Sequence, residues 1–191
     1  GLGTAQPTHA ITQHEMAAAA EPCCCATPRQ RKLLPALYRR TTVATRNSVV
    51  LNATNGQAQL PMNQRMLDFY PPAEAAADRG PTLSQRMKRY PEEALALAAD
   101  ACRSALADAA IRPDQASQLV VVSCTGFSSP GVDIGLIDVL GLPAIVGRTV
   151  VGFMGCLGAM NGLRVAGALA ESQTQRDANA TCPENGGGYV L

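Results

Sequence analysis

Cys156 is the residue of this chain best placed to act as a nucleophile. The apolar run that starts at Arg148 ends at Gly155 and Cys156, and a helix-like segment follows at once. A cysteine at such a junction lies beside unpaired backbone N–H groups and the positive end of a helix dipole, which stabilise a thiolate. Gly152 and Gly158 also bracket it, as a tight turn from strand to helix requires. The pattern predicts a sulfur nucleophile; the alternative is a small buried apolar side chain.

Alternating helices and strands are predicted around this cysteine. Residues 91–111 have apolar side chains at helical spacing, with Pro91 at the expected first position and two glutamates in the first turn. The β-branched runs at 119–123 and 148–153 show no alternation, which predicts strands covered on both faces. Strand followed by helix and strand implies parallel pairing with right-handed crossovers. The predicted elements are helix 91–111, strand 119–123, helix 134–140, strand 148–153 and helix 157–172.

The first ninety residues are less regular. Residues 1–20 predict a short strand or turn and then a helix, which Thr12 and Glu15 open with the spacing of a capping box. Residues 21–90 contain more polar sequence and several proline and glycine pairs, and they predict helices separated by loops.

Composition excludes several classes of partner. The 191 residues include 16 basic and 15 acidic side chains, a net charge of +1, so no basic field indicates nucleic acid. No apolar stretch is long enough to span a membrane, and no export signal opens the chain. Seven cysteines, with Cys23, Cys24 and Cys25 adjacent, give neither a disulfide framework nor a zinc spacing. We expect a cytoplasmic protein with no membrane segment, no nucleic-acid partner and no metal.

Three segments resemble a known family: VVVSCTG, SSPGVDIGLIDVLGLP and GRTVVGFMGCLGAMNGLRVAGALAES. Together with GLGTAQPTHAITQHE and YRRTTVATR, they are similar to the N-terminal half of the chalcone synthase-like type III polyketide synthases, which have the thiolase fold. The resemblance covers residues 1–172. It implies an α/β domain that is half of a layered fold, with a buried, mostly parallel sheet between helices. Residues 173–191 are polar and rich in turn formers, and we expect a divergent tail in loop or disorder.

The resemblance also implies an activity. Cys156 would accept an acyl group from a coenzyme A thioester and hold the chain during decarboxylative condensation with malonyl-CoA. A thiolate suits this exchange because it is both a good nucleophile and a tolerable leaving group. The family implies acyl-CoA and malonyl-CoA as substrates, no further cofactor, and a homodimer for the full-length parent.

Binding residues follow from the same resemblance. Cys124 and Thr125 would line the pocket for the starter acyl group, and Ser129 would approach the dimer-related subunit. Arg46, which has other arginines nearby, would meet the phosphates of coenzyme A, a task that suits guanidinium groups. Other interpretations stay open: Cys124 packs, Thr125 caps a turn, and the arginines form a solvated surface cluster.

A catalytic base is missing from the sequence. The family takes a histidine and an asparagine from its C-terminal half, whereas the histidines here are His9 and His14, far upstream of Cys156. Asp133 is expected to shape a turn or cap the following helix. Half a thiolase fold exposes a large apolar face, so we expect the 191 residues alone to be poorly soluble and inactive. The alternatives are a ketoacyl-ACP synthase III-like enzyme that uses acyl carrier protein, and an inactive interaction module or pseudogene product.

Overall fold

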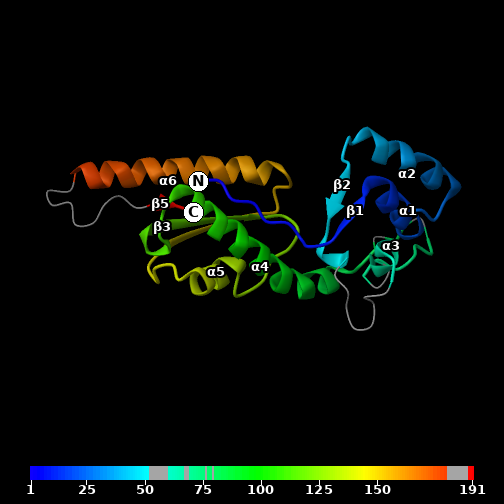
Figure 1. Cartoon of the computed structure of the whole chain (residues 1–191), viewed down its shortest axis with the longest axis horizontal. Coiled ribbons are helices and arrows are strands. Elements are labelled where there is room, and N and C mark those ends of the chain that lie inside the picture. The colour runs from blue at the N-terminus through cyan, green and yellow to red at the C-terminus, as the bar shows by residue number, and fades with distance from the viewer. Residues whose placement is uncertain (52–59, 67–68, 76, 79, 180–188) are drawn as a thin grey trace. The chain divides into compact units, whose positions relative to one another are not determined.

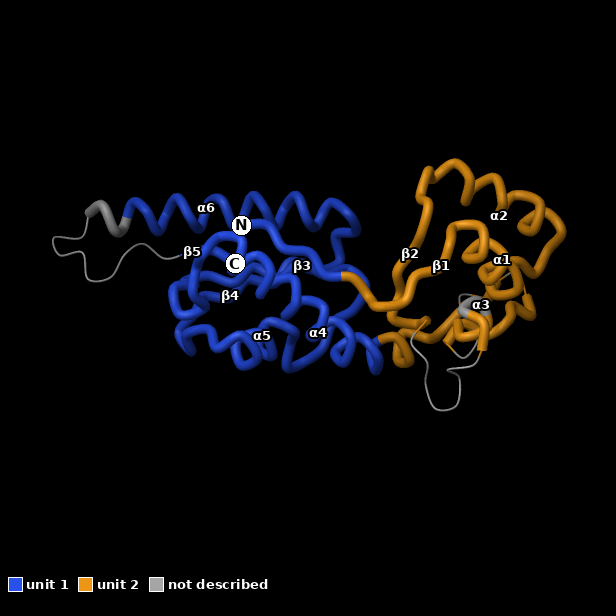
Figure 2. The backbone as a smooth tube through the Cα atoms, viewed as in Figure 1, with its two compact units in different colours: residues 1–5, 87–191 blue, residues 6–86 orange. Residues whose placement is uncertain are grey.

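The computed structural model describes residues 1–51, 60–66, 69–75, 77–78, 80–179 and 189–191 (Figure 1). These residues form two compact units (Figure 2). Unit 1 consists of Gly1–Ala5 and Met87–Leu191, and unit 2 consists of Gln6–Arg86. Each unit has its own cluster of buried apolar side chains.

A three-stranded parallel sheet forms the centre of unit 1. Strand β3 (Ala116–Ser123) lies between β4 (Gly147–Gly152) and β5 (Tyr189–Val190), and both neighbours run parallel to it. The parallel pairing of the first two strands was predicted from the sequence and is confirmed. The fold class, α/β, is confirmed as well.

Helices cover both faces of this sheet (Figure 1). Helix α6 (Leu157–Asn179) lies along one face, while α4 (Leu83–Ala109) and α5 (Val132–Leu140) lie along the other. A 3₁₀ turn, η3 (Pro113–Gln115), leads from α4 into β3. Residues 1–5 run beside α4, where the Leu2 N–H donates to Asp108 Oδ2 at 2.9 Å. The buried core lies between β3 and the helices α4 and α5: Ala99, Ala116, Leu119, Val132, Leu136, Leu140, Leu142 and Val146.

Strand β4 is less buried than the sequence predicts. The Val150 side chain is 59% exposed, and Val122 on β3 is 38% exposed. The reason is that β4 is an edge strand of the described sheet, and the helices α5 and α6 make more of their contacts with β3 than with β4. The continuous β-branched run therefore predicted the strand correctly, but it did not predict that side chains on the faces of the strand are exposed.

Two helices differ from their predicted limits. Helix α4 begins at Leu83 instead of position 91, because Thr82 and Gln85 form a capping box in which the Gln85 N–H donates to Thr82 Oγ1 at 3.2 Å. Pro91 consequently lies inside the helix. Helix α6 continues past residue 172 to Asn179, since the segment after it contains good helix formers.

The expected tail of residues 173–191 is thus only partly observed. Residues 173–179 are helical, and β5 adds a parallel strand to β3 instead of a loop. Residues 180–188, which include Cys182, lie outside the described part of the chain.

Unit 2 is a small helical unit with a two-stranded sheet. Strand β1 (Ala10–Thr12) pairs antiparallel with β2 (Thr45–Asn47), which the sequence did not predict. The helices are α1 (Gln13–Cys24), α2 (Pro28–Arg40) and α3 (Met62–Arg65), with a 3₁₀ turn η1 (Val49–Leu51) after β2. The capping box of Thr12 and Glu15 at the start of α1 is confirmed. The core of this unit consists of Ile11, Met16, Ala19, Leu51 and Met66.

No helix in the described part of the chain combines the length and the apolar character that a membrane crossing needs.

Candidate active site

The β4–α6 loop, residues 153–156, places Cys156 between the sheet and the helix. Cys156 directly precedes Leu157, the first residue of α6, and its side chain is exposed. The Gly158 N–H donates a hydrogen bond to the Gly155 carbonyl oxygen at 3.0 Å, so the turn around the cysteine leads straight into the helix. The first N–H groups of a helix have no partner within it, and here they adjoin the thiol. The strand-to-helix junction predicted from the sequence is present.

The backbone of this loop is unusual at two positions. Phe153 has φ of 60° and Gly155 has φ of 58°, both in the left-handed region. A phenylalanine rarely adopts this conformation, and such strain is found where the surroundings enforce it. Of the three glycines expected to serve the turn, only Gly155 has positive φ. At Gly158 a Cβ would lie 3.1 Å from Val122 Cγ1, so this glycine allows α6 to pack closely on β3.

Exposed apolar residues flank Cys156 in the sequence. Phe153 is 78% exposed, Met154 is 50% exposed and Leu157 is 58% exposed. Among the described residues, none forms a hydrogen bond or ion pair with Cys156. The thiol is therefore open to a large reactant, but no side chain of unit 1 that the structure describes is in place to accept its proton. His9 and His14, the two histidines of the chain, belong to unit 2.

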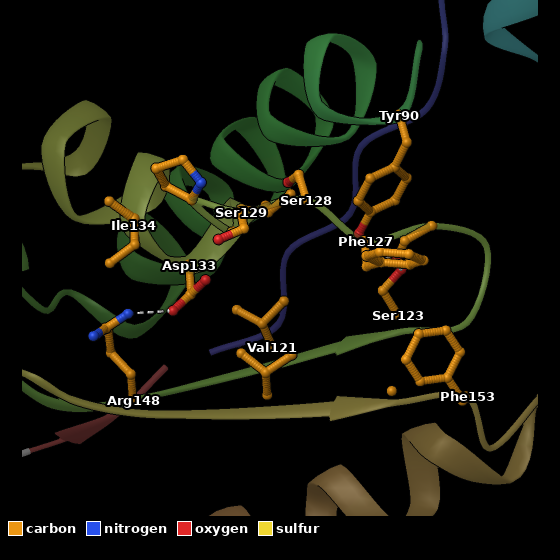
Figure 3. Close-up of a pocket in the computed structure, with 16 residues that line it drawn as sticks. Tyr90, Val121, Ser123, Phe127, Ser128, Ser129, Asp133, Ile134, Arg148 and Phe153 are labelled. Atoms are coloured by element: carbon orange, nitrogen blue, oxygen red, sulfur yellow. Dashed lines mark hydrogen bonds and ion pairs between the residues drawn. The ribbon is translucent and has the colours of Figure 1, made fainter. Parts of the chain in front are cut away.

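A cleft of about 320 Å³ in unit 1 includes Phe153 of the β4–α6 loop in its wall (Figure 3). The Tyr90 hydroxyl donates to Ser123 Oγ at 2.8 Å, and Ser123 Oγ donates to the Gly126 carbonyl oxygen at 3.2 Å. The Phe127 and Phe153 rings meet edge to face, with centroids 5.6 Å apart. The loop that carries the cysteine is thereby in contact with the loop that follows β3.

An ion pair lies at the other end of this cleft (Figure 3). Arg148 Nη1 on β4 donates to Asp133 Oδ2 on α5 at 2.6 Å, and Asp133 is only 6% exposed. The N-cap residue of α5 is Gly131, which has no side chain, and Asp133 lies in the first turn of the helix. Asp133 therefore does not cap the helix, as the sequence suggested it could; it joins the first turn of α5 to the edge strand.

The cleft also holds Ser129, one of the predicted binding residues. Ser129 and its neighbour Ser128 both line it, and Figure 3 shows them on the segment that leads toward Asp133. Ser128 Oγ is buried and has no hydrogen-bond partner among the described residues. A buried hydroxyl without a partner is unusual in a folded protein, so this wall of the cleft has a polar group available for a ligand or a partner.

Cys124 and Thr125 follow β3 at the same edge of the sheet as the β4–α6 loop. In the register of the two strands Ser123 pairs with Gly152, so the two loops start from neighbouring positions. Both predicted residues are exposed. The carboxyl ends of parallel strands are where open α/β sheets place their ligands. Their role beside a starter acyl group stays a prediction.

Arg46 belongs to unit 2, where it lies on β2. Arg46 Nε donates to Gln13 Oε1 at 2.6 Å, and its guanidinium carbon lies 5.6 Å from the centroid of the Tyr38 ring. Gln13 in turn donates to the Tyr38 carbonyl oxygen and to Thr41 Oγ1. Burial raises the pKa of Tyr38, and the charge of Arg46 offsets part of that rise. Arg46 is thus held at the C-terminal end of α2 and is not a freely solvated side chain.

The terminal nitrogens of Arg46 have no partner among the described residues. Arg46 lines a cleft of about 300 Å³ in unit 2, which Cys24 and Tyr70 also line. A guanidinium that is anchored through Nε and has two nitrogens left over is suited to bind an anion.

Sequence reasoning missed Tyr90, Phe127 and Arg148 in the unit 1 cleft. For Arg148 a signal was present, because a single arginine opens an apolar strand and a single aspartate opens an apolar helix nearby. Tyr90 and Phe127 carry no comparable signal, since their contact depends on how α4 and the loop after β3 fold together.

Comparison with known proteins identifies the family. The sequence model for the N-terminal domain of chalcone and stilbene synthases matches residues 1–185. This chain belongs to that family. It is 31% identical over 188 residues to the alpha-pyrone synthesis polyketide synthase-like Pks18 of Mycobacterium tuberculosis, covering 96% of this chain and 42% of that protein. It is 30% identical over 172 residues to type III polyketide synthase C of Arabidopsis thaliana, covering 90% of this chain and 41% of that protein.

Solved structures agree with this result. The chain is similar to PKS-I of the brown alga Ectocarpus siliculosus with a TM-score of 0.68 and 31% identity, over 90% of this chain and 43% of that one. It is similar to CsyB complexed with CoA-SH with a TM-score of 0.70 and 28% identity, over 92% of this chain and 42% of that one. The chain spans about two-fifths of the length of the curated relatives it matches. The predicted thiolase-like fold of type III polyketide synthases is confirmed.

Proposed function

We propose that this chain forms the N-terminal part of an enzyme that condenses an acyl-CoA starter with malonyl-CoA, and that Cys156 is its nucleophile. Membership of the chalcone and stilbene synthase family carries the proposal. The exposed thiol at the end of β4, directly before α6, supports it. The free cysteines of the described chain suit a reducing compartment, and we place the enzyme in the cytoplasm.

The proposed reaction has two stages. The Cys156 thiolate attacks the carbonyl carbon of the acyl-CoA thioester, a new C–S bond forms on the enzyme, and coenzyme A leaves as its thiolate and takes up a proton. Malonyl-CoA then loses carbon dioxide, and the resulting carbon nucleophile attacks the acyl group. The C–S bond to Cys156 breaks, and the enzyme thiolate is regenerated. Tethering the acyl group keeps it at high effective concentration for the second stage.

Coenzyme A phosphates are the proposed ligands of Arg46. Its Nε is fixed by Gln13 while its terminal nitrogens are available within the described structure. Gln13, which binds Arg46, also donates to the end of α2, and Arg39 and Arg40 lie in the last turn of that helix. One relative of similar fold, CsyB, was solved with CoA-SH bound. Charge-assisted contacts from guanidinium groups to phosphate are strong, and they would orient the thioester.

The proton of the Cys156 thiol requires a base from outside unit 1. We propose that it comes from the part of the relatives' length that this chain does not span, together with the amide that stabilises the developing oxyanion. The exposed apolar side chains around Cys156 would pack against that part. Ser129 and the unpartnered Ser128 hydroxyl would face a second subunit of a homodimer.

The test is to trap the acyl-enzyme. The full-length protein that contains this chain is incubated with an acyl-CoA alone, and its intact mass and peptides are measured. We expect one acyl group on Cys156 and no loading of Cys156→Ala, with product formation lowered at least about 1000-fold. Cys102→Ala, which removes a partly buried thiol that lines neither of the two clefts described above, is the control and should load normally.

Three outcomes would refute the proposal. Loading that persists in Cys156→Ala would assign the nucleophile to another residue. Loading from an acyl carrier protein thioester but not from acyl-CoA would instead favour the synthase III-like alternative, for which the relatives described above give no support. A folded full-length protein whose Cys156 stays unmodified with every thioester would favour the non-enzymatic module.

A further inference from the structure

Helix α2 in unit 2 presents a stripe of leucines and cations. Arg29, Lys32, Leu33, Ala36, Leu37 and Arg40 recur at intervals of three and four residues. Residues at that spacing share one side of an α-helix. We refer to these six residues as the α2 stripe.

The leucines of the stripe are exposed. Leu33 is 50% exposed and Leu37 is 59% exposed, and no residue of α2 in the described structure is fully buried. Leu34 and Tyr38, on the other side of the helix, are partly buried instead, so the helix does have an inward face. Neither Leu33 nor Leu37 lines the cleft beside Arg46. Within the described structure, these two neighbouring leucines are therefore left without cover.

The charge of α2 is strongly one-sided. Residues 28–40 contain five basic side chains and no acidic one, in a chain whose net charge is only +1. Arg31, outside the stripe, is 3.9 Å from Glu21 in an exposed ion pair. The stripe cations Arg29, Lys32 and Arg40 have no ion-pair partner among the described residues. The local positive charge is thus available to an external anion.

We propose that the α2 stripe docks this protein on an anionic lipid surface. The leucines would enter the boundary between headgroups and acyl chains, and the cations would contact lipid phosphates. A basic helix with exposed leucines on the same side is typical of helices that lie in the membrane interface. Long cationic side chains reach the headgroups while their stems stay against apolar groups. The occupant is a lipid surface because a nucleic acid would leave the leucines in water, whereas the boundary of an anionic lipid layer takes up both the leucines and the cations.

This inference concerns attachment to one leaflet and is compatible with the absence of a membrane-crossing helix in the described chain. It does not depend on Cys156 or on acyl transfer. The cytoplasmic leaflet of cell membranes is negatively charged, so it attracts such a basic segment.

The test is sedimentation of the full-length protein with vesicles. The protein should sediment with vesicles of phosphatidylcholine that contain phosphatidylglycerol. It should stay in the supernatant with vesicles of phosphatidylcholine alone. The double substitution Leu33→Gln/Leu37→Gln should weaken binding on the order of tenfold, and Arg29→Gln/Lys32→Gln should weaken it and reduce its salt dependence. Leu83→Gln is the matched control, since Leu83 is a similarly exposed leucine of unit 2 outside the stripe. Circular dichroism checks that each variant is folded.

Three results would overturn the proposal. The first is no sedimentation with either vesicle. The second is unchanged binding of a folded Leu33→Gln/Leu37→Gln protein, which would show that the leucines take no part. The third is binding to soluble polyglutamate but not to vesicles, which would assign the stripe to an acidic protein partner.

Discussion

The two cysteine-bearing helix ends of this molecule differ in nearly every physical respect. Cys156 precedes the first residue of α6, in unit 1, and is exposed. Cys23 and Cys24 close α1, in unit 2, and Cys25 follows them. Cys23 and Cys25 are 7% and 3% exposed, and burial raises the pKa of both thiols. Cys23 Sγ also donates to the Tyr70 carbonyl oxygen at 3.0 Å.

The comparison leads us to predict that helix polarity and burial, rather than cysteine content, decide which thiol is reactive. A helix start presents N–H groups that stabilise negative charge, whereas a helix end presents carbonyl oxygens that oppose it. Three adjacent cysteines at the end of α1 are conspicuous in the sequence, but Cys23 and Cys25 are buried and only Cys24 is exposed. The single cysteine at the start of α6 lies where a helix presents N–H groups that stabilise negative charge.

Alkylation rates test this contrast most directly, and the largest effect is expected here. In the full-length protein at neutral pH, iodoacetamide should modify Cys156 at least about tenfold faster than Cys23 or Cys25. Because burial raises the pKa of the latter two, their thiolate fraction and labelling rate should increase only as pH rises above the usual thiol range. Peptide mass spectrometry with time gives each rate.

Cys24 sharpens the same experiment because it is exposed, as Cys156 is, but closes a helix. It should label faster than its buried neighbours and more slowly than Cys156. Equal rates for Cys24 and Cys156 would mean that exposure alone accounts for the contrast and that the helix start contributes nothing.

A substitution in the β4–α6 loop should have an effect of intermediate size. Gly155→Ala places a Cβ on a residue with φ of 58°, so we expect a loss of about 1 kcal/mol in unfolding free energy and slower acylation of Cys156. No atom lies within 4 Å of that Cβ, so the cost comes from the backbone and not from a clash. Denaturant melts and loading rates measure the two effects.

Gly167→Ala is the matched control, because Gly167 lies within α6 and its Cβ would also meet nothing. It should stabilise the helix by about 0.5–1 kcal/mol and leave loading unchanged. A stabilised Gly155→Ala protein would show that the loop does not need positive φ in solution.

The smallest effect is expected at the end of α1. Cys23→Ala removes the hydrogen bond to the Tyr70 carbonyl oxygen and should cost only about 0.5 kcal/mol in unfolding free energy, because a thiol is a weak donor. Acyl loading of Cys156 should be unaffected, which the intact-mass assay measures. A loss of loading in a folded Cys23→Ala protein would contradict a purely structural role.

Local signals in the sequence predicted most elements of unit 1 and the first helix of unit 2. The apolar runs and helical spacing located β3, β4, α5 and the start of α6, and the Thr12 capping box located α1, because each depends on side chains close in sequence. The predicted start of α4 was wrong. Proline is common at the first position of a helix, and the sequence therefore predicted that the helix begins at Pro91. The capping box of Thr82, nine positions earlier, overrides it.

Contacts between distant segments account for what the sequence did not predict. Strand β2 is three residues long and is defined by its pairing with β1. Strand β5 exists because Tyr189 and Val190 pair with β3. In the site, Cys156 and Ser129 were singled out by motif, whereas the contact of Phe153 with Phe127 depends on the meeting of two loops.

The first five residues give the chain an unusual order of assembly. They belong to unit 1, yet their partner Asp108 lies on α4, and the whole of unit 2 comes between them. During synthesis on the ribosome, the whole of unit 2 emerges before α4 does. Residues 1–5 can therefore contact α4 only after unit 2 has been made. Unit 1 therefore closes over a long loop in the chain, whose entropy cost grows only slowly with length. A single backbone cut within unit 2 would leave two polypeptides that still share one folded sheet domain.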